Sequence, residues 1–280
     1  MVRSVRPDNA SFRHEVTIES REPGGYIPQS KRHDRLGASL ETPQRRLVIF
    51  DCDGVLVDSE ILACDVQARA VTDYGLPLSG AEVAGRFLGM SARDMRASLE
   101  ADLGRPLPSD HEARCAAELY ALFRRELKPV KGMTDVVAAL WAADHPRCVA
   151  SSSSPERITL ALEVAGLHEA FRPHVFSSSM VARGKPAPDL FLHAANLMGF
   201  AEKDCIVIED SANGVRAARS AGMLVIGFLG GTHCPPAHGE SLAEAGAQRI
   251  CRDADELAET LSGLAGVAAV LPAEVRPTSS

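Results

Sequence analysis

The feature that most constrains the fold is a repeated alternation of short apolar runs with amphipathic helical patterns. The apolar runs are Leu47–Phe50, Cys148–Ala150, His174–Phe176, Cys205–Ile208 and Leu224–Phe228. Helical patterns follow at 155–165, 188–198, 213–221 and 254–264. Such alternation is typical of a parallel sheet with helices on both faces. The sequence therefore predicts an α/β fold with a Rossmann-like, doubly wound sheet, whose right-handed crossovers bring all strand C-terminal ends to one edge.

One interval breaks the alternation. Between the first two predicted strands, most of residues 61–130 have helical patterns, and this interval is too long for a simple crossover. We therefore predict a small α-helical cap domain at 61–130, inserted after the first strand and able to act as a lid over the ligand-binding edge. The α/β core is then expected to comprise residues 46–60 and 131–265.

Both ends of the chain differ from this pattern. Residues 1–45 are interrupted by Pro and Gly and have no sustained apolar period. We predict that they form a flexible N-terminal extension, and that residues 266–280 form a flexible C-terminal tail. The sequence leaves the role of the extension open.

Composition excludes several classes of partner. Residues 1–46 hold nine Lys and Arg against six Asp and Glu, whereas the remainder holds 21 against 31, and such an acidic body is a poor nucleic-acid binder. No stretch approaches the ~18 consecutive apolar residues of a membrane span. The seven cysteines are scattered without a CxxC pair, which favours reduced thiols in a cytoplasmic protein. Whether the protein is a monomer or a dimer stays open.

Polar residues follow the predicted strands and should converge at one edge of the sheet. Asp51 and Asp53 follow the first strand, and residues i and i+2 of an extended chain point to the same side. Glu209 and Asp210 follow the fourth strand. Carboxylates packed this closely repel one another, and Mg²⁺ resolves such a conflict because it prefers carboxylate and phosphate oxygens. Lys185 adds a positive charge, so the cluster is suited to a phosphoryl group that Asp51 could attack.

The serine run 151–154 adds donors to this edge. Ser151 ends the second predicted strand, and Pro155 occupies the first turn of the helix that follows. The Ser151 hydroxyl and the N–H groups of that helix N-terminus can donate to phosphoryl oxygens. A serine run before a helix is also an ordinary N-cap, so the inference depends on its combination with the other strand-end residues.

These motifs together resemble the haloacid dehalogenase (HAD) superfamily, and in particular its β-phosphoglucomutase-like and sugar-phosphate phosphatase branch with a helical cap. The resemblance covers about residues 46–265. The segments that carry it are Phe50–Glu60, Val149–Ser151, Gly184–Asp189 and Val207–Ser211.

The resemblance implies a role for each strand-end residue. Asp51 would be the nucleophile that forms an aspartyl-phosphate, and Asp53 would protonate the leaving group and then deprotonate water. Ser151 and Lys185 would hold the phosphoryl oxygens. The Mg²⁺ cofactor would be bound by Asp51, the backbone carbonyl of Asp53, Glu209 and Asp210. We expect the pKa of Asp53 to be drawn towards neutrality, because this group must both donate and accept a proton.

Substrate choice is expected to come from the cap and from the serine run. Residues 86–93 resemble the family's cap loop, and Arg86 or Arg93 could meet an anionic group of the substrate. The predicted substrate-binding residues are Gly89, Arg93, Ser152 and Ser153. The places of a mutase histidine and a mutase cap arginine fall on Ala63 and Ala92, and both departures favour a phosphatase.

The sequence therefore predicts a Mg²⁺-dependent phosphatase acting on a small-molecule phosphate ester, either a sugar phosphate or a sugar-acid phosphate. The alternatives are a β-phosphoglucomutase-like phosphotransferase, a non-enzymatic phospho-acceptor of the receiver type, and a pseudo-enzyme. The natural substrate stays open. One further cluster, His233, Cys234 and His238, has ligands suited to a transition metal, but Pro235 and Pro236 stiffen this loop and no second ligand pair is evident, so we favour a surface or active-site-rim loop.

Overall fold

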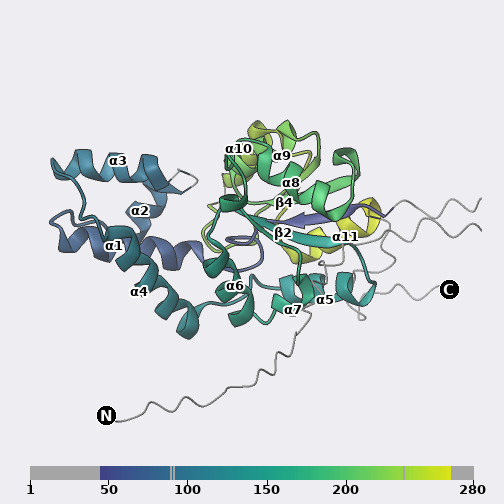
Figure 1. The fold of residues 1–280 in the computed structure, drawn as a ribbon, viewed down its shortest axis with the longest axis horizontal. Helices are drawn as coiled ribbons and strands as arrows, with labels where there is room; N and C mark the ends of the chain where they lie inside the picture. The colour runs from purple at the N-terminus through teal and green to yellow at the C-terminus, as the bar shows by residue number, and fades with distance from the viewer. Residues whose placement is uncertain (1–44, 89, 91, 236, 266–280) are drawn as a thin grey trace, which may run out of the picture.

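The computed structural model describes residues 45–88, 90, 92–235 and 237–265. Apart from residue 45, the predicted extension at 1–45 lies outside the described residues, as does the predicted tail at 266–280. Figure 1 shows a helical lobe on one side and an α/β body on the other.

The α/β body is built on a six-stranded sheet in which every pairing is parallel, in the order β3-β2-β1-β4-β5-β6. The strands are β1 (Leu47–Phe50), β2 (Arg147–Ser151), β3 (Val175–Ser177), β4 (Cys205–Glu209), β5 (Leu224–Phe228) and β6 (Arg249–Cys251). The predicted doubly wound α/β fold is confirmed. The sixth strand was not predicted, because three residues with an exposed Arg at one end give too little apolar pattern.

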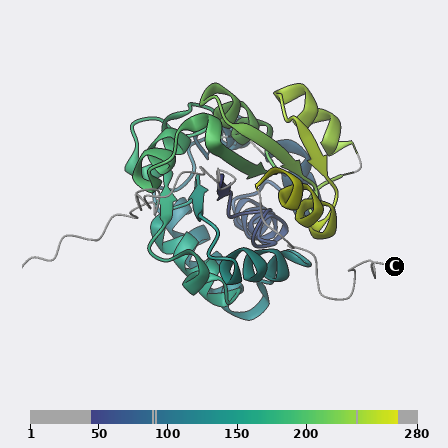
Figure 2. The same ribbon diagram turned by 90° about the vertical axis from the view of Figure 1, so that its right-hand side faces the viewer.

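Helices cover both faces of the sheet, which explains the near-continuous apolar strands. In β1, Val48 and Phe50 pack into one hydrophobic cluster, whereas Leu47 and Ile49 pack into the other. Figures 1 and 2 show the two helical layers. The first layer contains α5 (Met133–Ala142), α6 (Pro155–Val164), α7 (His168–Phe171) and α11 (Ala254–Leu264). The second contains α8 (Asp189–Met198), α9 (Ala212–Ser220) and α10 (His238–Ala245).

The helical lobe follows β1 in the chain and has its own apolar core. It consists of α1 (Glu60–Asp73), α2 (Gly80–Phe87), α3 (Ala92–Leu103) and α4 (His111–Glu126). Val71, Val83, Phe87 and Leu99 are among the residues of its buried cluster. The helix α2 begins directly after a capping box that Ser79 and Glu82 form. Among the described helices, none has the length and apolar character required to cross a membrane.

The lobe joins the body through two chain segments that lie side by side. Val57 forms an antiparallel bridge with Pro129. The N–H of Asp58 donates to the carbonyl of Lys128 at 3.0 Å, and that of Val130 donates to the carbonyl of Leu56 at 3.0 Å. The entry and exit of the lobe are therefore hydrogen-bonded to each other.

Candidate active site

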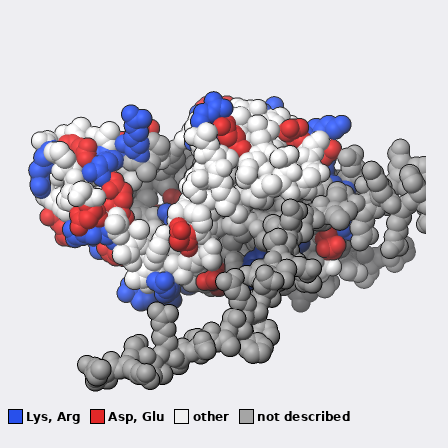
Figure 3. All heavy atoms as spheres, viewed as in Figure 1, with Lys and Arg blue, Asp and Glu red and all other residues white. Residues whose placement is uncertain are grey.

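The strands of the sheet point their carboxyl ends towards the helical lobe (Figure 1). The molecular surface is hollowed between the lobe and the body (Figure 3). Asp51 directly follows β1, Ser151 ends β2 and Glu209 ends β4, so all three lie at this edge. Parallel topology thus brings together residues that are up to 158 positions apart in the chain.

Lys185 joins the first and fourth strand ends. Its Nζ donates to Oδ1 of Asp51 at 2.7 Å, to Oε1 of Glu209 at 2.5 Å and to the carbonyl of Ala150 at 3.0 Å. The Lys185 side chain is only 5% exposed. Burial alone would lower the pKa of Lys185, but the two carboxylates outweigh burial and raise it. Lys185 is therefore a buried, permanently charged ammonium group beside the predicted nucleophile.

Three carboxylates form a cluster around this lysine. One oxygen each from Asp51, Glu209 and Asp210 lie within 4.8 Å of one another, and all three residues are buried. Burial raises the pKa of Asp51 well above its usual range; the charge of Lys185 opposes this effect, and the charges of Glu209 and Asp210 add to it. Three buried carboxylates with one ammonium form an oxygen-rich site with excess negative charge, which fits Mg²⁺. A bound cation would lower the Asp51 pKa again, because it stabilises the carboxylate form.

Small residues allow this close packing. A Cβ on Gly54, whose φ is +76°, would lie 1.9 Å from Oδ2 of Asp210. A Cβ on Gly214 would lie 1.8 Å from Oε1 of Glu209. The other Glu209 oxygen accepts hydrogen bonds from the N–H and the hydroxyl of Ser211, at 3.1 and 2.9 Å. Glycines at these two positions thus let the acidic side chains approach the backbone and fix their orientation.

Asp53 lies outside this carboxylate cluster. Its Oδ1 accepts from the Ser59 hydroxyl at 2.6 Å and from Nη2 of Arg157 at 2.7 Å, and its Oδ2 accepts from the Ser153 hydroxyl at 2.6 Å. Any metal contact by Asp53 would therefore use its backbone carbonyl, as the family resemblance implied. Burial would raise the pKa of Asp53, but Arg157 and the two hydroxyls outweigh it and lower this pKa. The expectation of a pKa drawn towards neutrality is wrong for this arrangement, because it did not include Arg157.

The serine run follows β2 and contributes to the same edge. Ser151 is buried, and its hydroxyl accepts from the N–H of Ser153 at 3.1 Å. Ser153 bonds Asp53 as described, whereas the Ser152 side chain is exposed and its carbonyl accepts from the Ser178 hydroxyl. Ser154 caps α6 by accepting from the N–H of Arg157. The run thus both caps a helix and faces the predicted acid-base residue.

The predicted cap residues are less closely connected to the site. Gly89 lies outside the described residues. Arg93 is exposed in the first turn of α3. Arg86 forms an ion pair with Asp102 inside the helical lobe, which offers a structural explanation for this arginine.

The structure shows features of three residues, Arg157, Glu60 and His233, that the sequence reasoning missed. Arg157 binds Asp53, but from the sequence alone an arginine in the first turn of a helix is expected to be a solvent-exposed charge. Glu60 begins α1, and burial together with the charges of Asp53 and Asp210 raises its pKa to about 7. His233 places Nε2 at 2.9 Å from Oδ2 of Asp210. Burial would lower the His233 pKa, but its contacts with Asp210 and Cys234 raise it to about 11. Only the fold reveals these partners, because they come from distant segments.

Comparison with known proteins identifies relatives of this chain in sequence and in fold. Residues 45–222 match the family model of haloacid dehalogenase-like hydrolases. The 6-phosphogluconate phosphatase of Escherichia coli is 30% identical over 68% of this chain and 85% of that protein. A haloacid dehalogenase-like protein of unknown function from Agrobacterium tumefaciens has a crystal structure with a TM-score of 0.70, at 37% identity over 79% of this chain and 99% of that one. The structure of a HAD family hydrolase from Deinococcus radiodurans, solved with bound phosphate and sodium, has a TM-score of 0.67. It is 33% identical in sequence over 80% of this chain and 99% of that one.

Proposed function

Because the chain belongs to the haloacid dehalogenase-like hydrolase family, we propose that it is a Mg²⁺-dependent phosphatase of small phosphorylated metabolites. The substrate class we favour is sugar phosphates and sugar-acid phosphates. Relatives named for such substrates support this choice, among them the 6-phosphogluconate phosphatase described above and a hexitol phosphatase, also from Escherichia coli, that is 31% identical over 64% of this chain. Family membership also excludes the receiver-type alternative.

The observation that carries the proposal is the contact of Lys185 with both Asp51 and Glu209 beside Asp210. An ammonium group and a carboxylate cluster at one point suit a phosphoryl group, whose oxygens need positive charge as the bond to phosphorus changes. Bound Mg²⁺, held by Asp51, Glu209, Asp210 and the Asp53 carbonyl, would supply further charge neutralisation. Lys185 and the Ser151 hydroxyl would orient the phosphoryl oxygens.

We infer a two-step reaction. A carboxylate oxygen of Asp51 attacks phosphorus, the ester P–O bond breaks, and the departing alkoxide takes a proton from Asp53. Water then attacks the phosphorus of the aspartyl-phosphate and gives a proton to Asp53, which releases phosphate and restores Asp51. Asp53 can donate only when protonated, so its ion pair with Arg157 must loosen, or the phosphoryl charge must offset that pair, when substrate binds.

The test is phosphate release from a panel of sugar phosphates and sugar-acid phosphates, measured with Mg²⁺ and with EDTA. We expect metal-dependent turnover on at least one member, and its loss in Asp51→Asn while the fold is retained. Asp135→Asn, an exposed acid on α5, is the matched control and should keep the activity. Absence of turnover across the panel would favour the pseudo-enzyme alternative, and an isomerised sugar phosphate in place of free phosphate would favour the phosphotransferase.

A further inference from the structure

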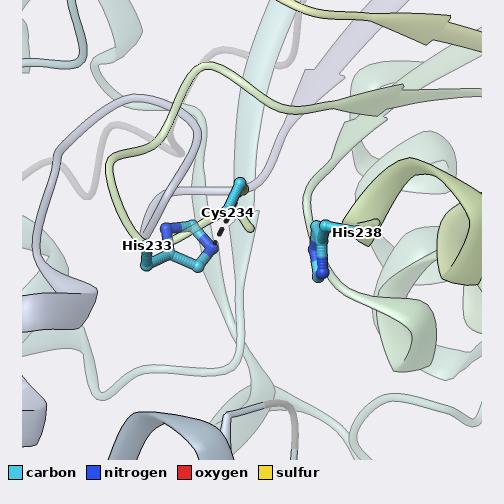
Figure 4. Close-up of side chains that lie close together, drawn as sticks. All are labelled: His233, Cys234 and His238. Atoms are coloured by element: carbon cyan, nitrogen blue, oxygen red, sulfur yellow. Dashed lines mark hydrogen bonds between the residues drawn. The ribbon is translucent and has the colours of Figure 1, made fainter. Parts of the chain in front are cut away.

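The segment between β5 and α10 brings three metal-ligand side chains together. His233 and Cys234 lie in this segment, and His238 is the first residue of α10. Figure 4 shows the His233 and Cys234 side chains facing each other, with the His238 ring opposite them. Nε2 of His233 lies 3.4 Å from Sγ of Cys234. One ring nitrogen of each histidine and this sulfur all lie within 4.8 Å of one another.

We propose that His233, Cys234 and His238 form a binding site for a soft divalent cation of the Zn²⁺ type, beside the carboxylate cluster. Thiolate and imidazole ligands select zinc over magnesium, which prefers oxygen. Two ligand atoms on one tetrahedral zinc, with bonds of about 2.3 Å to sulfur and about 2.0 Å to nitrogen, lie about 3.5 Å apart. The observed sulfur–nitrogen separation of 3.4 Å matches this spacing.

The backbone holds these ligands in place. The N–H of Cys234 donates to the carbonyl of Gly231 at 3.1 Å, and that of His238 donates to the carbonyl of Pro235 at 2.9 Å. Oδ1 of Asp58 accepts from both the N–H and the hydroxyl of Thr232, at 3.1 and 2.9 Å. A ligand set held by its own loop binds a cation with little further ordering.

The two imidazoles differ in how the ring nitrogen that faces away from the sulfur is held. Nε2 of His238 donates to the backbone carbonyl of Asp210, the kind of contact that orients ligating histidines. The His233 side chain is 4% exposed, and its Nδ1 is buried without a hydrogen-bond partner among the described residues. Hydrogen bonds therefore satisfy only one side of the His233 ring.

The site adjoins the carboxylate cluster through Asp210. Its Oδ2 lies 2.9 Å from Nε2 of His233, within reach of the fourth position of a tetrahedral zinc. Asp210 is also one of the ligands that we propose for Mg²⁺. If the protein is the phosphatase proposed above, bound Zn²⁺ would draw Asp210 away from Mg²⁺ and inhibit phosphate release.

The experiment titrates the reduced full-length protein with Co²⁺ and Zn²⁺ in excess Mg²⁺, which keeps the oxygen site filled. We expect one equivalent of Co²⁺ to give a thiolate-to-metal charge-transfer band that one equivalent of Zn²⁺ abolishes. Cys234→Ser should weaken Zn²⁺ binding by at least about 100-fold, since loss of residues that merely support a metal ligand costs 10–100-fold. Cys115→Ser is the matched control, because Cys115 is also half-buried beside a histidine, with Sγ 3.8 Å from Nδ1 of His111.

A second measurement needs no substitution at the site. Zn²⁺ should protect Cys234 of the wild-type protein from iodoacetamide, read by mass spectrometry, while Cys115 is alkylated at an unchanged rate. Asp51→Asn should still bind Zn²⁺, so this result is independent of whether the protein is a phosphatase. Absence of a charge-transfer band, its persistence in Cys234→Ser, or unprotected Cys234 would each overturn the proposal.

Discussion

Arg157 is expected to control the ionisation of Asp53, and its replacement by Met tests this directly. Nη2 of Arg157 lies 2.7 Å from Oδ1 of Asp53, and the two side chains are 23% and 11% exposed. Unit charges about 4 Å apart interact by about 4 kcal/mol at an effective dielectric constant of 20. Their remaining contact with solvent reduces this energy, and we take about 2 kcal/mol.

The sign of the pH dependence follows from the lowered pKa of Asp53 in the folded protein. A carboxyl group of this kind contributes stability above its unfolded pKa of about 3.9, and that stability is lost as the pH falls through the folded pKa. In Arg157→Met the carboxylate stays buried without its cation, so its pKa rises. The difference in unfolding free energy between wild type and variant should therefore be largest near neutral pH and should shrink as the pH falls towards 4.

The assay is urea denaturation of a double-mutant cycle made of wild type, Arg157→Met, Asp53→Asn and the double variant. The cycle isolates the pair, because effects of Arg157 on other neighbours, such as Phe123, cancel. We expect a coupling of about 2 kcal/mol near neutral pH. A coupling below about 0.5 kcal/mol, which is the usual error of additivity, would refute the idea that the guanidinium sets the ionisation of Asp53.

Two further predictions concern the carboxylate cluster. Lys185→Met leaves Asp51 and Glu209 buried without their ammonium group, so the free energy of unfolding in EDTA should fall by about 3–5 kcal/mol. Added Mg²⁺ should restore part of this stability, whereas the control Lys203→Met should be as stable as the wild type. Equal stability of Lys185→Met with and without Mg²⁺ would contradict the prediction. Gly54→Ala should weaken Mg²⁺ binding, measured by calorimetry, because the new Cβ displaces Asp210. Gly75 is the control, because it also has a positive φ but nothing lies within 4 Å of a Cβ added there. Gly75→Ala should lose only about 1–2 kcal/mol of stability and keep its Mg²⁺ affinity.

The fold was predictable from the sequence where local pattern and topology agree. The strands β1 and β5 and the helix α11 have their predicted bounds, because apolar runs and caps define their ends. The meeting of Asp51, Lys185 and Glu209 also followed from the rule that parallel strands share one carboxyl edge. The order and direction of the strands are enough to predict that residues at the strand ends lie together.

Residues whose partners are set by side-chain direction could not be predicted. Arg157 lies in the first turn of α6, and nothing in its neighbouring sequence indicates that its side chain reaches Asp53. The raised pKa of Glu60 likewise depends on burial and on charges from two other segments. The His233 loop was visible as a motif, but its contact with Asp210 required the path of the chain after β5.

The clamp between the two connecting segments, at Val57 and Pro129, has a consequence for how the chain can vary. Closing a flexible loop carries an entropy that grows only slowly with loop length. Here the ends of the inserted segment are hydrogen-bonded to each other, so a change in the length of its distant loops adds little closure entropy at the sheet. The insert is not freely exchangeable, however, because Leu122 and Phe123 of α4 pack into the same hydrophobic cluster as Phe50 of β1.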